Sequence, residues 1–167
     1  YTLFVGTPQQ DSDIRQFMEV RREAEKYGMP IIMWAYPRGT YVNKTGGKNS
    51  FFAVDYAARV ACELGADVVK VNFPETVDAK RDQYPAPYNE LRLSALESAR
   101  KVVQTAGRTL VIFSGGAKLP TEEMLQQARM GMEAGGVGLI FGRNMWQRPM
   151  DEAMELSRKV SGMMAEF

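Results

Sequence analysis

The chain has 167 residues, 45% of them hydrophobic, and its 21 basic and 20 acidic side chains leave a formal charge of +1. It contains no His and one Cys, which excludes Ser-His-Asp and Cys-His catalysis, His-ligated zinc and Cys-cluster metal sites. The balanced charge gives no reason to expect a nucleic-acid or membrane partner, and no apolar run reaches the ~20 residues that span a bilayer.

Short apolar runs alternate with longer amphipathic stretches along the whole chain. The runs are nearly continuous in Val, Ile, Leu and Phe, which is typical of parallel strands covered on both faces. The stretches between them repeat apolar residues at helical spacing. In chain order we expect strand 2–5, helix 13–27, strand 30–36, helix 51–64, strand 67–72, helix 88–106, strand 109–113, helix 121–134, strand 137–141 and helix 149–165.

A glycine follows four of these helices just ahead of the next strand, which predicts left-handed helix stops at Gly28, Gly65, Gly107 and Gly135. The repeated strand–helix order indicates an α/β fold with parallel strands and right-handed crossovers in a single domain over residues 1–167. Two architectures fit this order. One is an open doubly wound sheet, and the other is part of a (β/α)8 barrel, which when complete takes ~250 residues.

Lys70 lies in the middle of the third expected strand, on the same face as Val68 and Asn72. A strand covered on both sides has no solvated face for an ammonium group, and burying that charge unpaired costs several kcal/mol. We therefore expect the amine to lose its proton, to find a partner such as a carboxylate, or to reach solvent at the strand end. A desolvated neutral lysine is the nucleophile that Schiff-base chemistry needs.

The ends of three other expected strands carry polar-tipped or glycine-rich segments. Trp34 and Tyr36 share one face of the second strand, where they either fill a core or line a site. The fourth strand runs into Ser114-Gly115-Gly116, with Lys118 close behind, and the fifth runs into Gly142-Arg143. Glycine turns let backbone N–H groups approach an anion, and Arg binds phosphate in bidentate fashion. Two such turns indicate a phosphate site like the one after strands seven and eight of a barrel, which favours the barrel.

Five segments together resemble the archaeal-type class I fructose-bisphosphate aldolases, a family that includes the aminodeoxyheptulosonate synthases and related sugar-phosphate aldolases. They are YTLFVG (1–6), WAYPRG (34–39), GADVVK (65–70), SGGAK (114–118) and GRNMWQR (142–148). The resemblance implies a (β/α)8 TIM barrel of which this chain supplies strands four to eight, the first βα units being absent. It also implies a lyase that needs no metal or other cofactor and that cleaves a phosphorylated ketose, such as fructose 1,6-bisphosphate, to dihydroxyacetone phosphate and glyceraldehyde 3-phosphate.

The same resemblance implies the roles of individual residues. Lys70 forms the Schiff base, Tyr36 donates and accepts protons, and Trp34 shapes their site. The backbone of Ser114, Gly115, Gly116 and Gly142 holds the substrate phosphate together with Arg143. The family implies a homo-oligomer acting in glycolysis or gluconeogenesis, and a free Cys without a signal-peptide pattern predicts a cytoplasmic protein.

Two features depart from the family pattern. The acidic residue that the family has near the end of the first barrel strand has no counterpart here, and the Pro-rich connection 73–87 is longer than usual. Three alternatives stay open. The protein is an aminodeoxyheptulosonate synthase or another sugar-phosphate aldolase or transaldolase, an FMN-binding barrel oxidoreductase with a similar pair of glycine-rich turns, or an inactive barrel fragment that binds phosphate or a partner.

Overall fold

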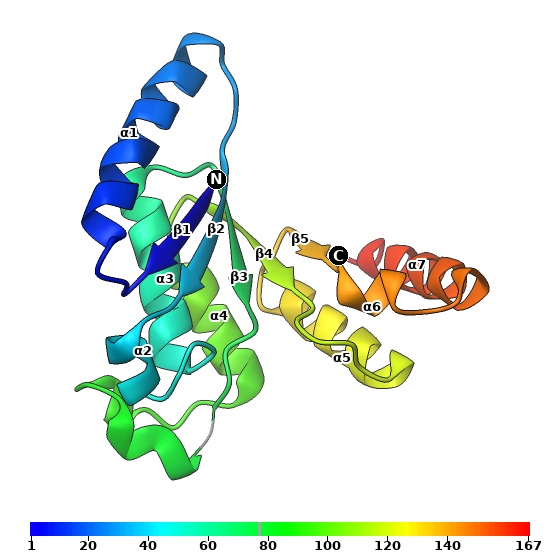
Figure 1. The fold of residues 1–167 in the computed structure, drawn as a ribbon. Helices are drawn as coiled ribbons and strands as arrows, with labels where there is room; N and C mark the ends of the chain where they lie inside the picture. The colour runs from blue at the N-terminus through cyan, green and yellow to red at the C-terminus, as the bar shows by residue number, and fades with distance from the viewer. Residues whose placement is uncertain (77) are drawn as a thin grey trace.

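The computed structural model describes residues 1–76 and 78–167, in which five parallel strands form one sheet (Figure 1). The strands are β1 (Thr2–Val5), β2 (Ile32–Pro37), β3 (Val68–Asn72), β4 (Leu110–Ser114) and β5 (Gly138–Ile140). The α-helices are α1 (Gln10–Lys26), α2 (Thr40–Lys44), α3 (Phe51–Leu64), α4 (Ala95–Thr105), α5 (Thr121–Glu133), α6 (Arg143–Trp146) and α7 (Met150–Met164). Two 3-10 helices, η1 (Asp78–Gln83) and η2 (Tyr88–Glu90), lie between β3 and α4.

All the expected strands and helices are confirmed in type, and the corrections concern where they begin and end. The expectation of one helix over 88–106 was wrong in its first part, because α4 begins only after Ser94. The Ser94 hydroxyl accepts a hydrogen bond from the Glu97 N–H, and the Glu97 carboxylate accepts one from the Ser94 N–H. This capping box sets the start of the helix. Helices α2 and α6 were not expected, since they are too short to show a helical period in the sequence.

The strands follow one another across the sheet in the order β1-β2-β3-β4-β5, with no reversal. Right-handed crossovers that always advance in one direction place all the helices on the same side of a sheet. Figure 1 shows α1, α3 and α4 gathered along β1 to β3, and α5, α6 and α7 around β5. An open doubly wound sheet needs a point where the strand order reverses, so that alternative does not describe this chain.

The two faces of the sheet differ in what covers them. One face carries Leu3, Met33, Val69 and Phe113, which pack in a single buried cluster with residues of α1, α3 and α4. The opposite face carries Lys70, and no helix of residues 1–76 and 78–167 covers it. Its apolar side chains Phe4, Ile32 and Leu110 are 41%, 42% and 49% exposed. The apolar residues on this second face are therefore only partly covered by the described part of the chain.

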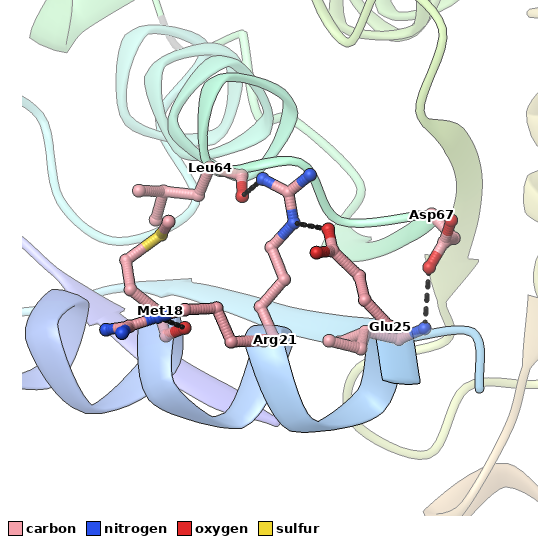
Figure 2. Close-up of polar contacts among 7 residues, drawn as sticks. Met18, Arg21, Glu25, Leu64 and Asp67 are labelled. Carbon is pink, nitrogen blue, oxygen red and sulfur yellow. Dashed lines mark hydrogen bonds and ion pairs between the residues drawn. The ribbon is translucent and has the colours of Figure 1, made fainter. Parts of the chain in front are cut away.

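Arg21 links α1 to the end of α3, beside the amino-terminal end of the sheet (Figure 2). Its guanidinium donates to the Leu64 carbonyl at 2.8 Å and pairs with Glu25 at 2.9 Å. Gly65 ends α3 in the left-handed region at φ 80°, and a Cβ there would collide with this guanidinium. Nearby, the Asp67 carboxylate accepts a hydrogen bond of 2.7 Å from the Ile31 N–H just before β2. These contacts fix how β2 and β3 enter the sheet.

Candidate active site

The strand register places the candidate residues in two adjacent layers on the uncovered face. Trp34 lies opposite Lys70, so these two residues share one layer. Tyr36 on β2 and Ser114 on β4 lie two residues further along their strands, in the layer nearer the carboxyl ends, where Asn72 lies opposite Ser114. Because the lysine side chain is long, the amine of Lys70 reaches from the first layer into the second.

Lys70 is buried against the two aromatic residues of β2. Its side chain is 8% exposed, and its amine donates a hydrogen bond to the Tyr36 hydroxyl. The nitrogen lies 4.8 Å from the centroid of the Tyr36 ring and 5.6 Å from that of Trp34. None of the ion pairs among the described residues involves Lys70. The partner of the Lys70 amine is therefore a phenol and not a carboxylate, and the two rings line the amine instead of filling the core.

The two glycine turns lie side by side at the carboxyl ends of β4 and β5. The N–H of Gly115 donates to the Ile140 carbonyl at 3.2 Å and so continues the pairing of the two strands. A Cβ at Gly115 would collide with the Phe141 ring, and Gly116 has a φ of +61°. Arg143 is exposed, and its guanidinium makes no hydrogen bond or ion pair with a described residue. Its guanidinium is thus available to a ligand beside the turns.

Asn144 joins the two turns, although no pattern in the sequence singled out its side chain. This fully buried amide donates to the carbonyls of Gly115 and Ala117 at 2.9 and 3.0 Å. Its oxygen accepts from the Leu119 N–H at 2.9 Å. Lys118, which closely follows the first turn, donates to the Gln147 carbonyl at 2.7 Å. Both side chains therefore hold the segment after β4 against the segment after β5.

A second set of polar residues that the sequence did not indicate extends from Ser114 away from the turns. The Ser114 hydroxyl donates to Asn72 Oδ1 at 2.8 Å, and Asn72 Nδ2 donates to Asn49 Oδ1 at 2.8 Å. Asn49 Nδ2 then donates to Glu75 Oε1 at 2.9 Å. Of the three residues beyond Ser114, only Asn72 was marked by the sequence, because it shares a strand face with Lys70.

The connection between β3 and α4 is anchored on α3 by a buried polar pair. The Tyr88 hydroxyl donates to Asp55 Oδ2 at 2.6 Å, and the Tyr88 ring packs against Phe51 and Phe52. Burial raises the pKa of the Asp55 carboxyl above its ordinary value of 3.8, and the Tyr88 hydrogen bond opposes this only in part. Burial, and then the contact with Asp55, raises the pKa of Tyr88 as well. The long connection is therefore packed against the body of the protein.

Residues 1–76 and 78–167 also bear on other kinds of site. No group of three or more His, Cys, Asp or Glu residues there is placed to hold a metal ion. No helix there is long and apolar enough to cross a membrane. A hollow of about 310 Å³ lies at the amino-terminal end of β2 and β3, beside Arg21, Glu25 and Asp67. Its charged groups are largely paired with one another or with backbone, and it lies away from the Lys70 amine.

A family model described as DeoC/LacD family aldolase matches residues 1–148. The chain belongs to the DeoC/LacD aldolase family. It is 34% identical over 163 residues to the fructose-bisphosphate aldolase class 1 of Thermoproteus tenax, and 32% identical over 148 residues to that of Halobacterium salinarum. These matches cover 96% and 89% of this chain but 52% and 48% of the relatives. The chain thus spans about half the length of the curated relatives that it matches.

Solved structures of aldolases have the same fold. An archaeal fructose-1,6-bisphosphate aldolase, whose catalytic Lys is covalently bound to the carbinolamine intermediate of its substrate, matches with a TM-score of 0.78 and 28% identity. The match covers 98% of this chain and 56% of that one. The fructose-bisphosphate aldolase of Slackia heliotrinireducens matches with a TM-score of 0.82 and 30% identity, over 100% of this chain and 48% of that one. The resemblance to the archaeal-type class I aldolases is therefore confirmed.

Proposed function

We propose that this chain is the catalytic part of a Schiff-base aldolase that cleaves fructose 1,6-bisphosphate reversibly to dihydroxyacetone phosphate and glyceraldehyde 3-phosphate. The observation that carries the proposal is the buried amine of Lys70, held between Trp34 and Tyr36 and hydrogen bonded to the Tyr36 hydroxyl. The next strands along the chain bring two glycine turns and Arg143 to the same end of the sheet. The reacting amine and a phosphate site thus lie on one face.

We infer that β1 to β5 are strands four to eight of a (β/α)8 barrel and that further βα units of the whole protein close it. The unidirectional strand order and the single covered face support this inference. In a closed barrel the second face becomes the interior, where Phe4, Ile32 and Leu110 find apolar partners. The catalytic residues then lie at the carboxyl ends of barrel strands, as is general for enzymes with this fold.

The reaction starts from the neutral amine of Lys70, which attacks the ketose carbonyl. Loss of water from the carbinolamine leaves an iminium ion, and this electron sink allows the bond between C3 and C4 to break. The C4 hydroxyl loses its proton as the aldehyde leaves, and the enamine takes up a proton at C3. Water then releases dihydroxyacetone phosphate and the free amine. Tyr36, which already contacts the amine, is placed to carry these protons.

Phosphate binding serves to orient the carbonyl toward the amine. Backbone N–H groups of Ser114, Gly116 and Gly142 and the Arg143 guanidinium are the proposed donors, and Gly115, whose own N–H pairs with the Ile140 carbonyl, shapes the turn beside the phosphate. They hold the substrate at a fixed distance from Lys70, so binding energy is used for positioning. We propose a cytoplasmic homo-oligomer that acts in glycolysis or gluconeogenesis, as the family resemblance implies.

Another sugar-phosphate aldolase of the same family is the second candidate. A Methanocaldococcus jannaschii protein named fructose-bisphosphate aldolase/6-deoxy-5-ketofructose 1-phosphate synthase is 32% identical over 161 residues, covering 46% of that protein. For this second candidate, Lys70 and the phosphate site of this chain act in the same way on a different phosphorylated ketose. Measuring whether the full-length protein forms 6-deoxy-5-ketofructose 1-phosphate, beside its cleavage of fructose 1,6-bisphosphate, separates these candidates.

Borohydride trapping tests the Schiff base directly. Full-length protein incubated with dihydroxyacetone phosphate and borohydride should gain a reduced adduct on Lys70, located by peptide mass spectrometry. Lys70→Met should remove the adduct and abolish turnover. An adduct on another lysine, or none, would refute the proposed role of Lys70.

A further inference from the structure

A chain of three side-chain hydrogen bonds links the connection after β3 to the site. It runs from Ser114 to Asn72, from Asn72 to Asn49 and from Asn49 to Glu75, with distances of 2.8, 2.8 and 2.9 Å. Ser114 is buried and the two amides are half-buried. We call this set the Glu75 relay.

The Glu75 end of the relay is fixed by the backbone. The Glu75 N–H donates to the Asn49 carbonyl at 2.7 Å, and the Phe51 N–H donates to the Glu75 carbonyl at 3.2 Å. These bonds form a short parallel bridge between the segment that follows β3 and the segment that precedes α3. The carboxylate and the Asn49 amide are therefore held next to each other by main-chain contacts as well as by their own bond.

The charge of Glu75 sets the direction of every bond in the relay. An ionised carboxylate only accepts hydrogen bonds, so Asn49 has to present its NH2 group to Glu75. The oxygen of Asn49 then faces Asn72, which donates to it, and the oxygen of Asn72 faces Ser114. Because an amide oxygen cannot donate, the hydroxyl proton of Ser114 is committed to Asn72.

The opposite direction is disfavoured by the same charge. For Ser114 to donate elsewhere while keeping its contact with Asn72, Asn72 would have to turn its NH2 group toward Ser114 and its oxygen toward Asn49. Asn49 would then place its own oxygen against the Glu75 carboxylate. Two acceptors would face each other there without a proton between them, so the hydrogen bond between Asn49 and the exposed Glu75 carboxylate would be lost.

The consequence concerns what Ser114 offers to a ligand. With its single proton in use, the hydroxyl presents only lone pairs to the site, in the layer that the Lys70 amine reaches. The oxygens of a phosphate dianion are acceptors and find no donor in this side chain. A hydroxyl group of a sugar is a donor and is well matched to it.

Resting on the function proposed above, we propose that the Ser114 side chain accepts a hydrogen bond from a hydroxyl of the ketose, and that the phosphate is held by backbone N–H groups and Arg143. Glu75, through Asn49 and Asn72, is the positioning residue that makes Ser114 an acceptor. The site therefore selects phosphorylated ketoses that carry a hydroxyl beside the carbonyl.

The first test compares Ser114→Ala with the wild-type full-length protein. We measure the dissociation constant of inorganic phosphate, and the concentrations of dihydroxyacetone phosphate and of acetol phosphate, its analogue without the free hydroxyl, that give half-maximal borohydride trapping. Ser114→Ala should leave the dissociation constant of phosphate and the half-maximal concentration of acetol phosphate unchanged. It should raise the half-maximal concentration of dihydroxyacetone phosphate by about 2- to 10-fold, which is what one neutral hydrogen bond contributes. A 10-fold or greater loss of phosphate affinity would show that Ser114 donates to phosphate, and would overturn the proposal.

The second test removes the charge that sets the direction. Glu75→Gln allows the relay to reverse, since a glutamine amide can donate to Asn49. Ser114 is then free to donate, and phosphate should bind about 2- to 10-fold more tightly. If losing the negative charge tightened phosphate binding by itself, the gain in affinity would persist in the double variant Glu75→Gln/Ser114→Ala. If the gain depends on the Ser114 hydroxyl, it should vanish in that double variant. Equal effects of Glu75→Gln in both backgrounds would overturn the role of Glu75.

Ser98→Ala is the matched control, because Ser98 is a buried serine of α4 whose hydroxyl has no partner among the described residues. It should change none of these constants. Circular dichroism shows whether each variant folds. Trapping of dihydroxyacetone phosphate on Lys70 reports the proposed aldolase chemistry separately. If trapping fails while phosphate binds, the proposed function is wrong. The dissociation constants of phosphate for the wild type, Ser114→Ala, Glu75→Gln and the double variant still decide which way the Ser114 hydroxyl donates.

Discussion

The Asn144 side chain joins the two glycine turns through three hydrogen bonds, which we call the clasp. Asn144→Ala is therefore the most informative substitution. The change removes three hydrogen bonds to the segment after β4, two to carbonyls and one from a backbone N–H. At about 1 kcal/mol each, their loss amounts to about 3 kcal/mol of unfolding free energy. Without these bonds the segment after β4 is no longer held against the segment after β5, so the backbone donors of the two turns spread apart. A phosphate that loses one of these charge-assisted bonds loses about 1.5 to 3 kcal/mol, which is roughly 10- to 150-fold in affinity.

The assay separates phosphate binding from the chemistry at Lys70. Borohydride trapping is measured with dihydroxyacetone phosphate and with dihydroxyacetone, which has the same carbonyl and no phosphate. Asn144→Ala should raise the half-maximal concentration of the phosphorylated ketone by at least about 10-fold and leave that of the other unchanged. Thr109→Val is the matched control, because it removes a buried hydrogen bond of 2.9 Å to the Ala66 carbonyl at the opposite end of β4. It should lower stability by about 1 kcal/mol and change neither concentration.

Two results would contradict this reasoning. If Asn144→Ala weakened trapping of both ketones equally, the clasp would act on the whole site and not on the phosphate turns. If it weakened neither, the turns would keep their spacing without Asn144, or would not bind the phosphate.

The remaining predictions concern the catalytic phenol, the buried carboxyl and the first turn. Tyr36→Phe should keep trapping on Lys70 but lower turnover about 100- to 10,000-fold, which steady-state kinetics would detect; unchanged turnover would remove Tyr36 from proton transfer. Because burial raises the pKa of Asp55, the folded state binds its proton more tightly than the unfolded state, so stability should fall as pH rises above 3.8 through the raised pKa. Asp55→Asn should lack this fall in urea titrations across that range, and an identical pH profile would contradict the assignment. Gly115→Ala should lower stability by about 1 to 3 kcal/mol, because its Cβ displaces Phe141, and should weaken phosphate binding in calorimetry; unchanged binding would exclude this turn from the phosphate site.

Local patterns in the chain were enough to predict the elements and the chemistry of single residues. Continuous apolar runs marked the strands because both faces of each strand meet other parts of a complete domain. Lys70 stood out because a charged residue within such a run has no ordinary place there. Gly28, Gly65, Gly107 and Gly135 all have positive φ, as expected for helix stops, since only glycine adopts that conformation without a steric cost.

The tertiary structure decided which polar side chains meet. Asn49, Asn72, Glu75 and Ser114 come from three separate segments, and Asn144 contacts a turn that lies more than twenty residues before it. No local period marks such residues, because hydrogen bonds between distant segments depend on strand order and register. The length, the balanced charge and the absence of His limited the chemistry to groups such as a lysine and a phenol. Only the fold could show that the amine and the phenol meet, since the register of β2 against β3 brings Tyr36 within reach of Lys70.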